Sequence, residues 1–396
     1  MYEMILPYGV EFIINRLESR GYCANVVGGS VRDFLRGVMP HDYDITTDAS
    51  PEEMKAVFSD VKTIETGIKH GTLTVLVDSV PYEVTTYRLD GEYSDNRHPD
   101  NVVFTKNLSD DLSRRDFTMN AIAYNKRDGI TDVFGGCDDI SKRVIRAVGE
   151  PERRFSEDAL RILRALRFAS VLNFEIEPLT AKAIFRKKEL LRGVSAERIM
   201  EEWKKLISGV AAHRILSQFS SVIEVFLPEL APFSLPDTSL FESASPLIRE
   251  AGLFYINSIS AENYSSAMMR LKSDNKRRLF VKDVISFADE DVSTDEKLNL
   301  LLIKCGKDCL KGVLELKCML KECNDSRIIA LNNLINSGCV YQVSHLDVRG
   351  NDIISLGISG KDVGACLDAL LISVVRGKTK NQKSDLLETA KSLYGI

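Results

Sequence analysis

Apolar and polar positions follow two different periods along the chain. Two early segments, Thr72–Val77 (TLTVLV) and Tyr82–Tyr87 (YEVTTY), alternate with a period of two and are rich in β-branched residues. This pattern is typical of strands with one buried face, and residues 78–81 are the predicted turn between them. Further strands are predicted at 24–27 and 43–46, and helices at 8–20 and 30–36.

The texture changes after Gly136. From there the sequence indicates one helix after another, with a short loop at residues 173–178 and few strand signals to the end. We therefore predict an α+β fold, in which an N-terminal head with a small mixed or antiparallel sheet is followed by an all-helical remainder.

Composition limits the class of protein. A chain of 396 residues that is 44% apolar is too long for one ordinary domain. The sequence shows no secretion signal and no run of about 18 apolar residues, so we expect a soluble cytoplasmic protein. Two close cysteine pairs, Cys305/Cys309 and Cys318/Cys323, have no histidine among them to complete a zinc site. Reduced thiols that serve mainly in packing are the favoured interpretation.

The net charge of −5 and the pI near 5.7 argue against indiscriminate binding of nucleic acids. Any contact with RNA must therefore be local, and each basic cluster has the alternative of being a solvated surface. The candidate clusters are Arg186, Lys187 and Lys188; Arg270, Lys272, Lys276, Arg277 and Arg278; and Arg376, Lys378 and Lys380.

Residues 27–46 (VGGSVRDFLRGVMPHDYDIT) hold the most informative motif. Gly28 and Gly29 precede a predicted helix, where backbone without side chains can approach phosphate oxygens, and Arg32 adds positive charge there. Asp42 and Asp44 are two apart, so on a strand they face the same side and can hold a divalent metal against a triphosphate. Each part alone also fits an ordinary turn or a solvated loop, but their order and spacing favour nucleotide transfer.

Four further motifs follow in the chain, with a weaker one near the C-terminus. The motifs are RRDFTMNA (114–121), DVFGG (132–136), EDALRILRALRF (157–168), SAERIMEEWKKL (195–206) and GNDIISLGISGKDVGACL (350–367). With these motifs the sequence resembles the class II tRNA nucleotidyltransferase and poly(A) polymerase family, and within it the bacterial CCA-adding enzymes.

The resemblance implies a fold, a reaction and its partners. It implies a polymerase-beta-like nucleotidyltransferase head at 1–136, a helical neck with the base-recognition helix at 137–210, a helical body at 211–325 and a tRNA-binding tail at 326–396. The implied reaction adds C, C and A to the 3′ end of tRNA from CTP and ATP without a template, releasing pyrophosphate. The implied cofactor is Mg²⁺ held by Asp42 and Asp44, and neither a membrane nor an obligate protein partner is indicated.

Glu83 lies on the hairpin expected beside Asp42 and Asp44. As a third carboxylate it would activate the attacking 3′-hydroxyl or complete the metal coordination. The alternative is a cross-strand ion pair with Lys69 or Arg88. Polar residues between Asp90 and Phe104 indicate a loop, which in the family is needed for the final addition of A.

The RRDFTMNA segment is predicted to begin with charge and continue into a helix, on which Asp116 and Asn120 share one face. Resemblance implies that Arg115 binds the incoming nucleotide and that Asp116 and Asn120 distinguish ribose from deoxyribose. A capped helix with a surface ion pair is the alternative.

The EDALRILRALRF segment is predicted to form one helix on which Asp158 and Arg161 are neighbours. Resemblance makes this pair the protein template for the base, with Arg164 and Arg167 as further nucleotide contacts. An amphipathic helix with exposed charges is the alternative.

The nearest rival functions are a poly(A) polymerase and a partial enzyme that adds only CC or only A. A poly(A) polymerase is disfavoured because no long basic C-terminal extension is seen, and an enzyme adding only CC is disfavoured because the loop after Asp90 is present. A non-catalytic tRNA-binding protein would be expected to lose Asp42 or Asp44. A transferase acting on proteins or small molecules would not need the helical remainder.

Overall fold

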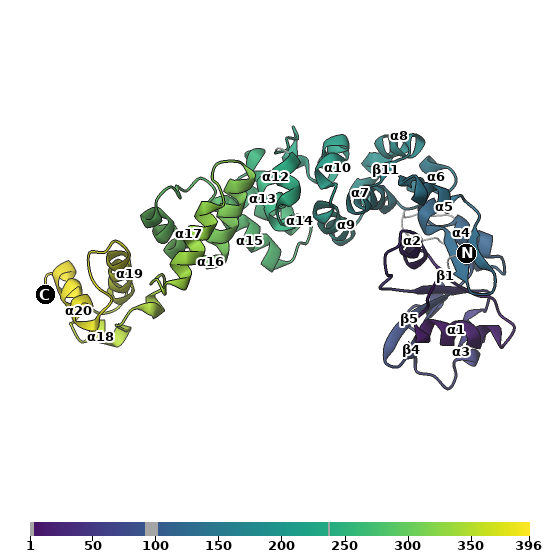
Figure 1. The fold of residues 1–396 in the computed structure, drawn as a ribbon, viewed down its shortest axis with the longest axis horizontal. Helices are drawn as coiled ribbons and strands as arrows, with labels where there is room; N and C mark the ends of the chain where they lie inside the picture. Colours follow the sequence, from purple (N-terminus) through teal and green to yellow (C-terminus); the bar gives the residue numbers. More distant parts are fainter. Residues whose placement is uncertain (1–3, 92–101, 237) are drawn as a thin grey trace. The chain divides into compact units, whose positions relative to one another are not determined.

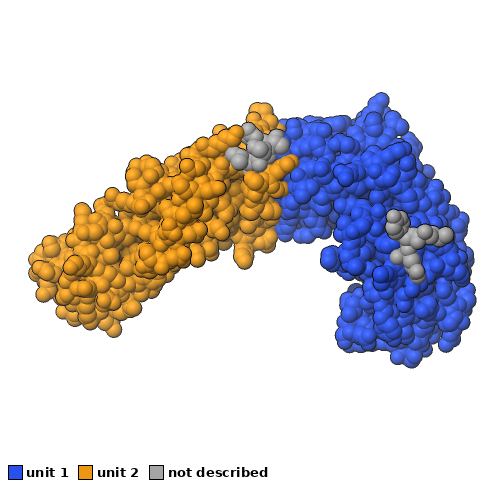
Figure 2. All heavy atoms as spheres, in the orientation of Figure 1, with its two compact units in different colours: residues 1–228 blue, residues 229–396 orange. Residues whose placement is uncertain are grey.

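The computed structural model describes residues 4–91, 102–236 and 238–396. It divides into two compact units, Met1–Pro228 and Glu229–Ile396 (Figure 2). The division into head, neck, body and tail stays a prediction.

A seven-stranded sheet forms the centre of the N-terminal part of unit 1, in the order β3-β4-β5-β2-β1-β8-β9. The sheet is mixed, because β2 and β5 run parallel while the other neighbours are antiparallel. A pair of strands, β6 and β7, flanks residues 92–101, and these central positions of the predicted loop lie outside the described residues. The strands are β1 Ala24–Val27, β2 Asp44–Thr47, β3 Thr63–Ile64, β4 Thr72–Val77, β5 Val80–Thr86, β6 Arg88–Asp90, β7 Val102–Phe104, β8 Ile122–Asn125, β9 Gly129–Asp132, β10 Val144–Ile145 and β11 Glu175–Ile176.

Helices cover this sheet and then continue along the chain (Figure 1). Helix α1 contacts β1, β2 and β5, and α2 contacts β1 and β8. In unit 1 the helices are α1 Tyr8–Glu18, α2 Gly29–Leu35, α3 Pro51–Val57, α4 Leu108–Ser113, α5 Gly136–Ser141, α6 Pro151–Glu157, α7 Leu160–Leu172, α8 Pro178–Lys187, α9 Ala196–Ser208, α10 Ala212–Gln218 and α11 Ser220–Phe226, with 3₁₀ turns η1 Ile68–His70, η2 Thr118–Asn120 and η3 Lys188–Gly193.

Unit 2 is helical in its described residues and buries two apolar clusters. One gathers around Leu298, Leu310 and Leu331, and the other around Ile353 and Leu370. Its helices are α12 Thr238–Ser243, α13 Pro246–Ile256, α14 Ala261–Arg270, α15 Asn275–Ser286, α16 Asp295–Met319 with a kink at Gly306, α17 Ser326–Asn336, α18 Gly350–Ile354, α19 Asp362–Val375 and α20 Lys383–Tyr394, with 3₁₀ turns η4 Pro228–Leu230, which begins at the unit boundary, and η5 Val343–His345.

The predicted α+β class, with a sheet-containing head before a helical remainder, is confirmed. One exception in the remainder is a short parallel pair, β10 with β11. No helix in the described ranges is long and apolar enough to cross a membrane.

The prediction that RRDFTMNA continues into a helix is wrong. Residues 118–120 form only the turn η2, and the chain then enters strand β8, which pairs with β1 and β9. All four residues of β8 are buried. This segment therefore pairs as a strand, although its mostly apolar sequence does not show the alternation of apolar and polar residues that would predict one.

The prediction of one continuous helix over EDALRILRALRF is also wrong. Helix α6 ends at Glu157, Asp158 is extended (φ −140°, ψ 106°), and α7 begins at Leu160. The Asp158 carboxylate accepts a hydrogen bond from the backbone N–H of Leu160 at 3.0 Å, which stabilises the break.

Candidate active site

A polar cavity of about 420 Å³ in unit 1 contains all ten residues predicted to bind the nucleotide, together with Asp44. Seven arginines and three aspartates line it, so the cavity is strongly positive although the whole chain is acidic. The lining residues are Gly28, Gly29, Arg32, Asp44, Arg114, Arg115, Asp116, Asn120, Asp158, Leu160, Arg161, Arg164, Arg167, Phe168 and Arg198.

Asp42 and Asp44 lie at the start of β2. Asp44 is the first residue of the strand, and exposure alternates from Asp42 to Ile45, with Tyr43 and Ile45 buried and both aspartates exposed. The two carboxylates therefore share one face of the extended chain. Desolvation raises the pKa of Asp44, Arg115 partly opposes this, and the nearby charge of Asp42 raises it further. A cation would relieve this repulsion.

The donor set fits a metal that is shared with a substrate. In the described part of the chain, no three His, Cys, Asp or Glu side chains gather closely enough to hold a metal alone. Magnesium is commonly held by one or two carboxylates together with substrate phosphates, and Asp42 with Asp44 supplies such a pair. The aspartates thus fit a metal that arrives with a nucleoside triphosphate.

Gly28 brings the backbone close to Arg115. Its φ of +76° is unfavourable for other residues, and a Cβ there would lie 3.0 Å from Nη1 of Arg115. Asp111 is completely buried in α4. Its carboxylate accepts hydrogen bonds from Arg114 at 2.7 Å and from Arg115 at 3.4 Å. Burial lowers the pKa of Arg115, although the nearby Asp111 counteracts the shift.

Asp116 links three sides of the cavity. Its Oδ1 accepts from Asn120 Nδ2 at 3.1 Å and its Oδ2 accepts from Arg164 Nε at 2.8 Å, while Asn120 Oδ1 accepts from Arg32 Nη1 at 2.9 Å. Burial alone would raise the pKa of Asp116, but Arg164 and the hydrogen bonds outweigh it and lower the pKa to about 2. Asp116 and Asn120 are thus close together although they do not share a helix.

Asp158 and Arg161 both line the cavity but are held by different partners. Asp158 Oδ2 accepts from Arg198 Nη2 of α9 at 2.8 Å. Arg161 donates from Nη1 to Glu157 at 2.9 Å and from Nη2 to the carbonyl of Arg114 at 3.0 Å. Two anchored side chains, a carboxylate and a guanidinium, thus face the cavity from the break before α7 and from its first turn.

Arginines from α7 and from α2 surround the ring of Phe168. The guanidinium of Arg167 lies 3.7 Å from the ring centroid, and those of Arg32 and Arg164 lie within 5.4 Å of it. Glu202 of α9 pairs with Arg167 at 3.0 Å. The cation–π contacts with Phe168 and the pairing with Glu202 therefore fix the positions of these guanidinium groups.

Glu83 lies outside the cavity lining. It is exposed on β5, one residue before Val84, which pairs with Ile45 of β2, so it is close in register to Asp44. Arg88, one of the alternative ion-pair partners, donates to the carbonyl of His70 at 2.5 Å. The role of Glu83 as a third carboxylate stays a prediction.

Sequence reasoning missed several residues of the site. Arg114 lies in RRDFTMNA and Phe168 lies in EDALRILRALRF, but the motifs assign a role only to neighbouring residues. Arg198 and Glu202 belong to SAERIMEEWKKL, and their i, i+4 spacing puts them on one face of α9. Asp111 gave no signal, since an Asp110–Asp111 pair shortly before RRDF is typical of the first turn of a helix.

The Gly28→Ala substitution is expected to weaken nucleotide binding about 10-fold or more. It adds backbone strain of roughly 1–3 kcal/mol and pushes against Arg115. Gly37→Ala is the matched control, because Gly37 has a similar φ of +73° but does not line the cavity. The dissociation constant of CTP, measured by equilibrium dialysis, checks the prediction. An equal or larger effect of Gly37→Ala would contradict it.

Comparison with known proteins finds relatives that match nearly the whole chain. The family model described as "Poly A polymerase head domain" matches residues 24–146, and the model described as "Probable RNA and SrmB- binding site of polymerase A" matches residues 173–234. A CCA-adding enzyme of Lactobacillus gasseri is 35% identical over 95% of both chains, and one of Staphylococcus saprophyticus is 34% identical over 96% of this chain and 97% of the other. The crystal structure of the Bacillus stearothermophilus CCA-adding enzyme in complex with CTP superposes with a TM-score of 0.84 at 32% identity, covering 99% of this chain and 98% of that one.

Proposed function

Because the chain belongs to the family of CCA-adding enzymes, we propose that it adds C, C and A in turn to the 3′ end of tRNA, using CTP and ATP and releasing pyrophosphate. The observation that carries the proposal is the arginine-lined cavity, whose lining includes Asp44, two residues after Asp42, and also the carboxylate–guanidinium pair Asp158 and Arg161. The first arrangement suits a triphosphate and its metal, and the second suits the edge of a base. Incorporation of labelled CTP and ATP into tRNA that lacks its CCA end tests the proposal.

Residues at the turn between β1 and α2 bind the triphosphate in this proposal. The backbone at Gly28 and Gly29 admits the phosphates closely, and Arg32 and Arg115 neutralise their charge. Arg115 enters this role with its Nε buried and without a hydrogen-bond partner, while Asp111 fixes its direction. The protein thereby orients the α-phosphate toward the tRNA end without itself taking part in bond formation.

Asp42 and Asp44 would hold the metal. Nucleotidyltransferases of this kind generally use divalent metal ions, and we propose Mg²⁺. When bound, Mg²⁺ stabilises charge on the attacking 3′-oxygen and on the departing pyrophosphate. Glu83, on the neighbouring strand, would accept the proton of the 3′-hydroxyl or complete the coordination.

Asp158 and Arg161 would select the base. A carboxylate oxygen accepts from the amino group of cytosine or adenine, and a guanidinium donates to the adjacent ring nitrogen. Uracil and guanine present a carbonyl oxygen and a ring N–H in these positions and would leave polar groups unpaired. Arg198 and Glu157 keep the two side chains in place. Asp116 and Asn120 would read the sugar, with Arg164 and Arg167 as further nucleotide contacts.

Among the candidate RNA-binding clusters, the one near α15 is mostly engaged within the protein. Arg277 is paired with the completely buried Glu250, Arg270 pairs with Glu229 at 2.8 Å, and Arg278 donates to Ser265 at 2.6 Å. Arg186 pairs with Glu152 at 2.5 Å. Lys378 and Lys380 are exposed after α19 and are the better candidates for phosphate contacts.

Replacing Lys378 and Lys380 together with glutamine is expected to reduce the salt dependence of tRNA binding. Each lost phosphate contact lowers the slope of log K against log[salt] by roughly 1, so the double variant should lose about 2. Lys304→Gln with Lys311→Gln is the control, because these exposed lysines already pair with Glu290 and Glu315. Filter binding between 50 and 200 mM salt, about the range in which such slopes are measured, provides the readout. An unchanged slope would return this cluster to ordinary solvated surface.

The proposed reaction gives the expected location. Because its substrate is tRNA, we propose that the protein works in the cytoplasm.

A further inference from the structure

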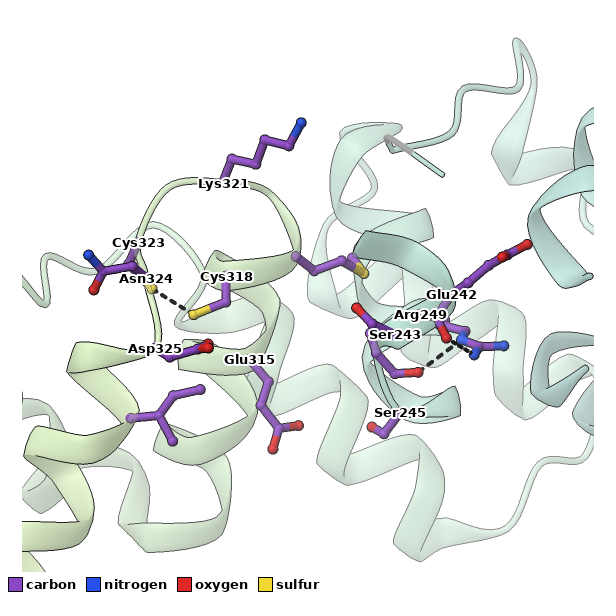
Figure 3. Close-up of a pocket in the computed structure, with 13 residues that line it drawn as sticks. Glu242, Ser243, Ser245, Arg249, Glu315, Cys318, Lys321, Cys323, Asn324 and Asp325 are labelled. Carbon is purple, nitrogen blue, oxygen red and sulfur yellow. Dashed lines mark hydrogen bonds between the residues drawn. The ribbon is translucent and has the colours of Figure 1, made fainter. Parts of the chain in front are cut away.

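Unit 2 contains a second cavity that shares no residue with the nucleotide cavity. Its volume is about 820 Å³, and it lies between the segment around the start of α13 and the end of α16 with the turn that follows (Figure 3). Its lining includes Glu242, Ser245, Arg249 and Glu315 together with two cysteines, Cys318 and Cys323. The proposed transfer reaction uses none of these residues.

The two cysteines face each other across the end of α16. Their Sγ atoms are 3.2 Å apart, and both side chains are partly exposed (Figure 3). Lys321, with φ of +61°, reverses the chain, and the carbonyl of Lys317 accepts hydrogen bonds from the N–H groups of Glu322 and Cys323. The backbone of the turn therefore keeps Cys323 beside Cys318.

We propose that Cys318 and Cys323 form a redox-active dithiol, which a low-molecular-weight disulfide oxidises to an intramolecular disulfide. A disulfide bond is about 2.05 Å long, so the sulfurs need to approach by only about 1.1 Å. This is within the reach of side-chain rotation on a turn that the backbone already closes. The cavity gives a small oxidant access to both sulfurs. The inference does not depend on the proposed transfer reaction.

The exchange proceeds in two steps that balance. The thiolate of Cys323 attacks one sulfur of the external disulfide, forming a mixed disulfide and releasing one thiolate. The sulfur of Cys318 then attacks Sγ of Cys323, forming the internal bond and releasing the second thiolate. The two cysteines lose two electrons and two protons, and the external disulfide becomes two thiols.

The order of attack follows from the surroundings of the two thiols. Burial raises the pKa of Cys318 to about 12, and its hydrogen bond with Cys323 contributes to the rise. Cys318 is therefore the poorer first nucleophile. The negative charge of the nearby Asp325 also contributes to the raised pKa of Cys318, and this carboxylate would take the proton of Cys318 in the second step.

Other cysteines of the chain provide internal comparisons. Cys305 and Cys309 are four apart on α16, but Cys309 is buried and the thiol of Cys305 donates to the carbonyl of Leu301 at 3.2 Å. Cys23 is exposed in unit 1, so the addition of glutathione to Cys23 serves as the control that the oxidant is active.

Tryptic peptides identify the disulfide directly. The reduced full-length protein is treated with oxidised glutathione under native conditions, alkylated and digested. Trypsin cleaves after Lys317, Lys321 and Arg327, so the two cysteines fall on separate peptides, 318–321 and 322–327. We expect these peptides to be recovered as one disulfide-linked pair. At the same oxidant concentration, Cys23 should carry glutathione and form no disulfide within the protein.

Single variants separate the steps. In Cys318→Ser, Cys323 should carry glutathione, whereas Cys305→Ser should form the linked peptides as the unchanged protein does. Recovery of 318–321 and 322–327 as separate alkylated peptides, while Cys23 carries glutathione, would overturn the proposal. So would a link that forms only after the protein is unfolded in urea.

Discussion

Replacing Asp42 or Asp44 with alanine is expected to reduce nucleotide transfer by about 10³-fold or more, while CTP and tRNA binding change much less. A metal ion contributes several kcal/mol to the stabilisation of charge in the transition state, and each 1.36 kcal/mol is tenfold in rate. Asp44 lines the cavity, and Asp42 precedes it by two residues on the same face of the extended chain. The other acidic residues of the lining, Asp116 and Asp158, already pair with Arg164 and Arg198. Single-turnover incorporation of labelled CTP measures the effect.

Asp138→Ala is the control for the loss of a carboxylate in the same unit. Asp138 is exposed on α5 and pairs with Lys142, away from the cavity. Its replacement should leave transfer unchanged, and circular dichroism should show all three variants folded. Near-normal turnover of Asp42→Ala with Mg²⁺ would remove the metal assignment.

Asp158→Ala is expected to reduce discrimination against UTP and GTP by about 10- to 100-fold. Each polar group left unpaired by the wrong base costs about 1–3 kcal/mol, and removing the acceptor removes this penalty for uracil and guanine. The acceptor is also required for binding the amino group of cytosine and adenine, so use of CTP and ATP should fall at the same time. The metal pair is untouched, so some transfer should remain.

Incorporation of single nucleotides on tRNA ending at the discriminator base, at C and at CC measures the selectivity. Glu189→Ala is the matched control, because it removes an exposed carboxylate that pairs with Arg192 at 2.8 Å and does not line the cavity. Wild-type selectivity of Asp158→Ala at all three ends would show that base choice lies elsewhere. The start of α7 would then be purely structural.

Local patterns predicted those elements whose periodicity is set by one buried face. The alternation in Thr72–Val77 gave β4 with its observed bounds, and the hairpin with β5 closes through Asp78 and Ser79 at positive φ. Local patterns did not predict the parallel pairing of β2 with β5. About 40 residues separate the two strands, and the sequence of a strand does not show which other strand pairs with it. The sheet therefore appeared as mixed or antiparallel, without its order.

The two errors in helix prediction share a physical cause. Ile122–Asn125 is buried on both faces, so its strand shows no alternation, and the break at Asp158 contains neither glycine nor proline. Arg198, 40 residues further along, holds the extended Asp158 in place. Contacts of this kind between distant residues decide local structure and cannot be read from a short window of sequence.

The cavity shows the same division. The family motifs predicted that Gly28, Arg115 and Asp158 belong to one site, and in the structure all three line one cavity. The partners that fix their directions, such as Asp111, Glu157 and Glu202, became apparent only in the fold. Motifs therefore identified the side chains that face the cavity better than those that hold them.

Stepwise incorporation on tRNA lacking its last three nucleotides tests the central claim most directly. With Mg²⁺, CTP alone should add two residues, ATP should add one residue only after two C residues are present, and extension should then stop. UTP and GTP should add none. Long A tails with ATP alone, addition that ends at CC in the presence of ATP, or no incorporation at all would contradict CCA addition by this protein.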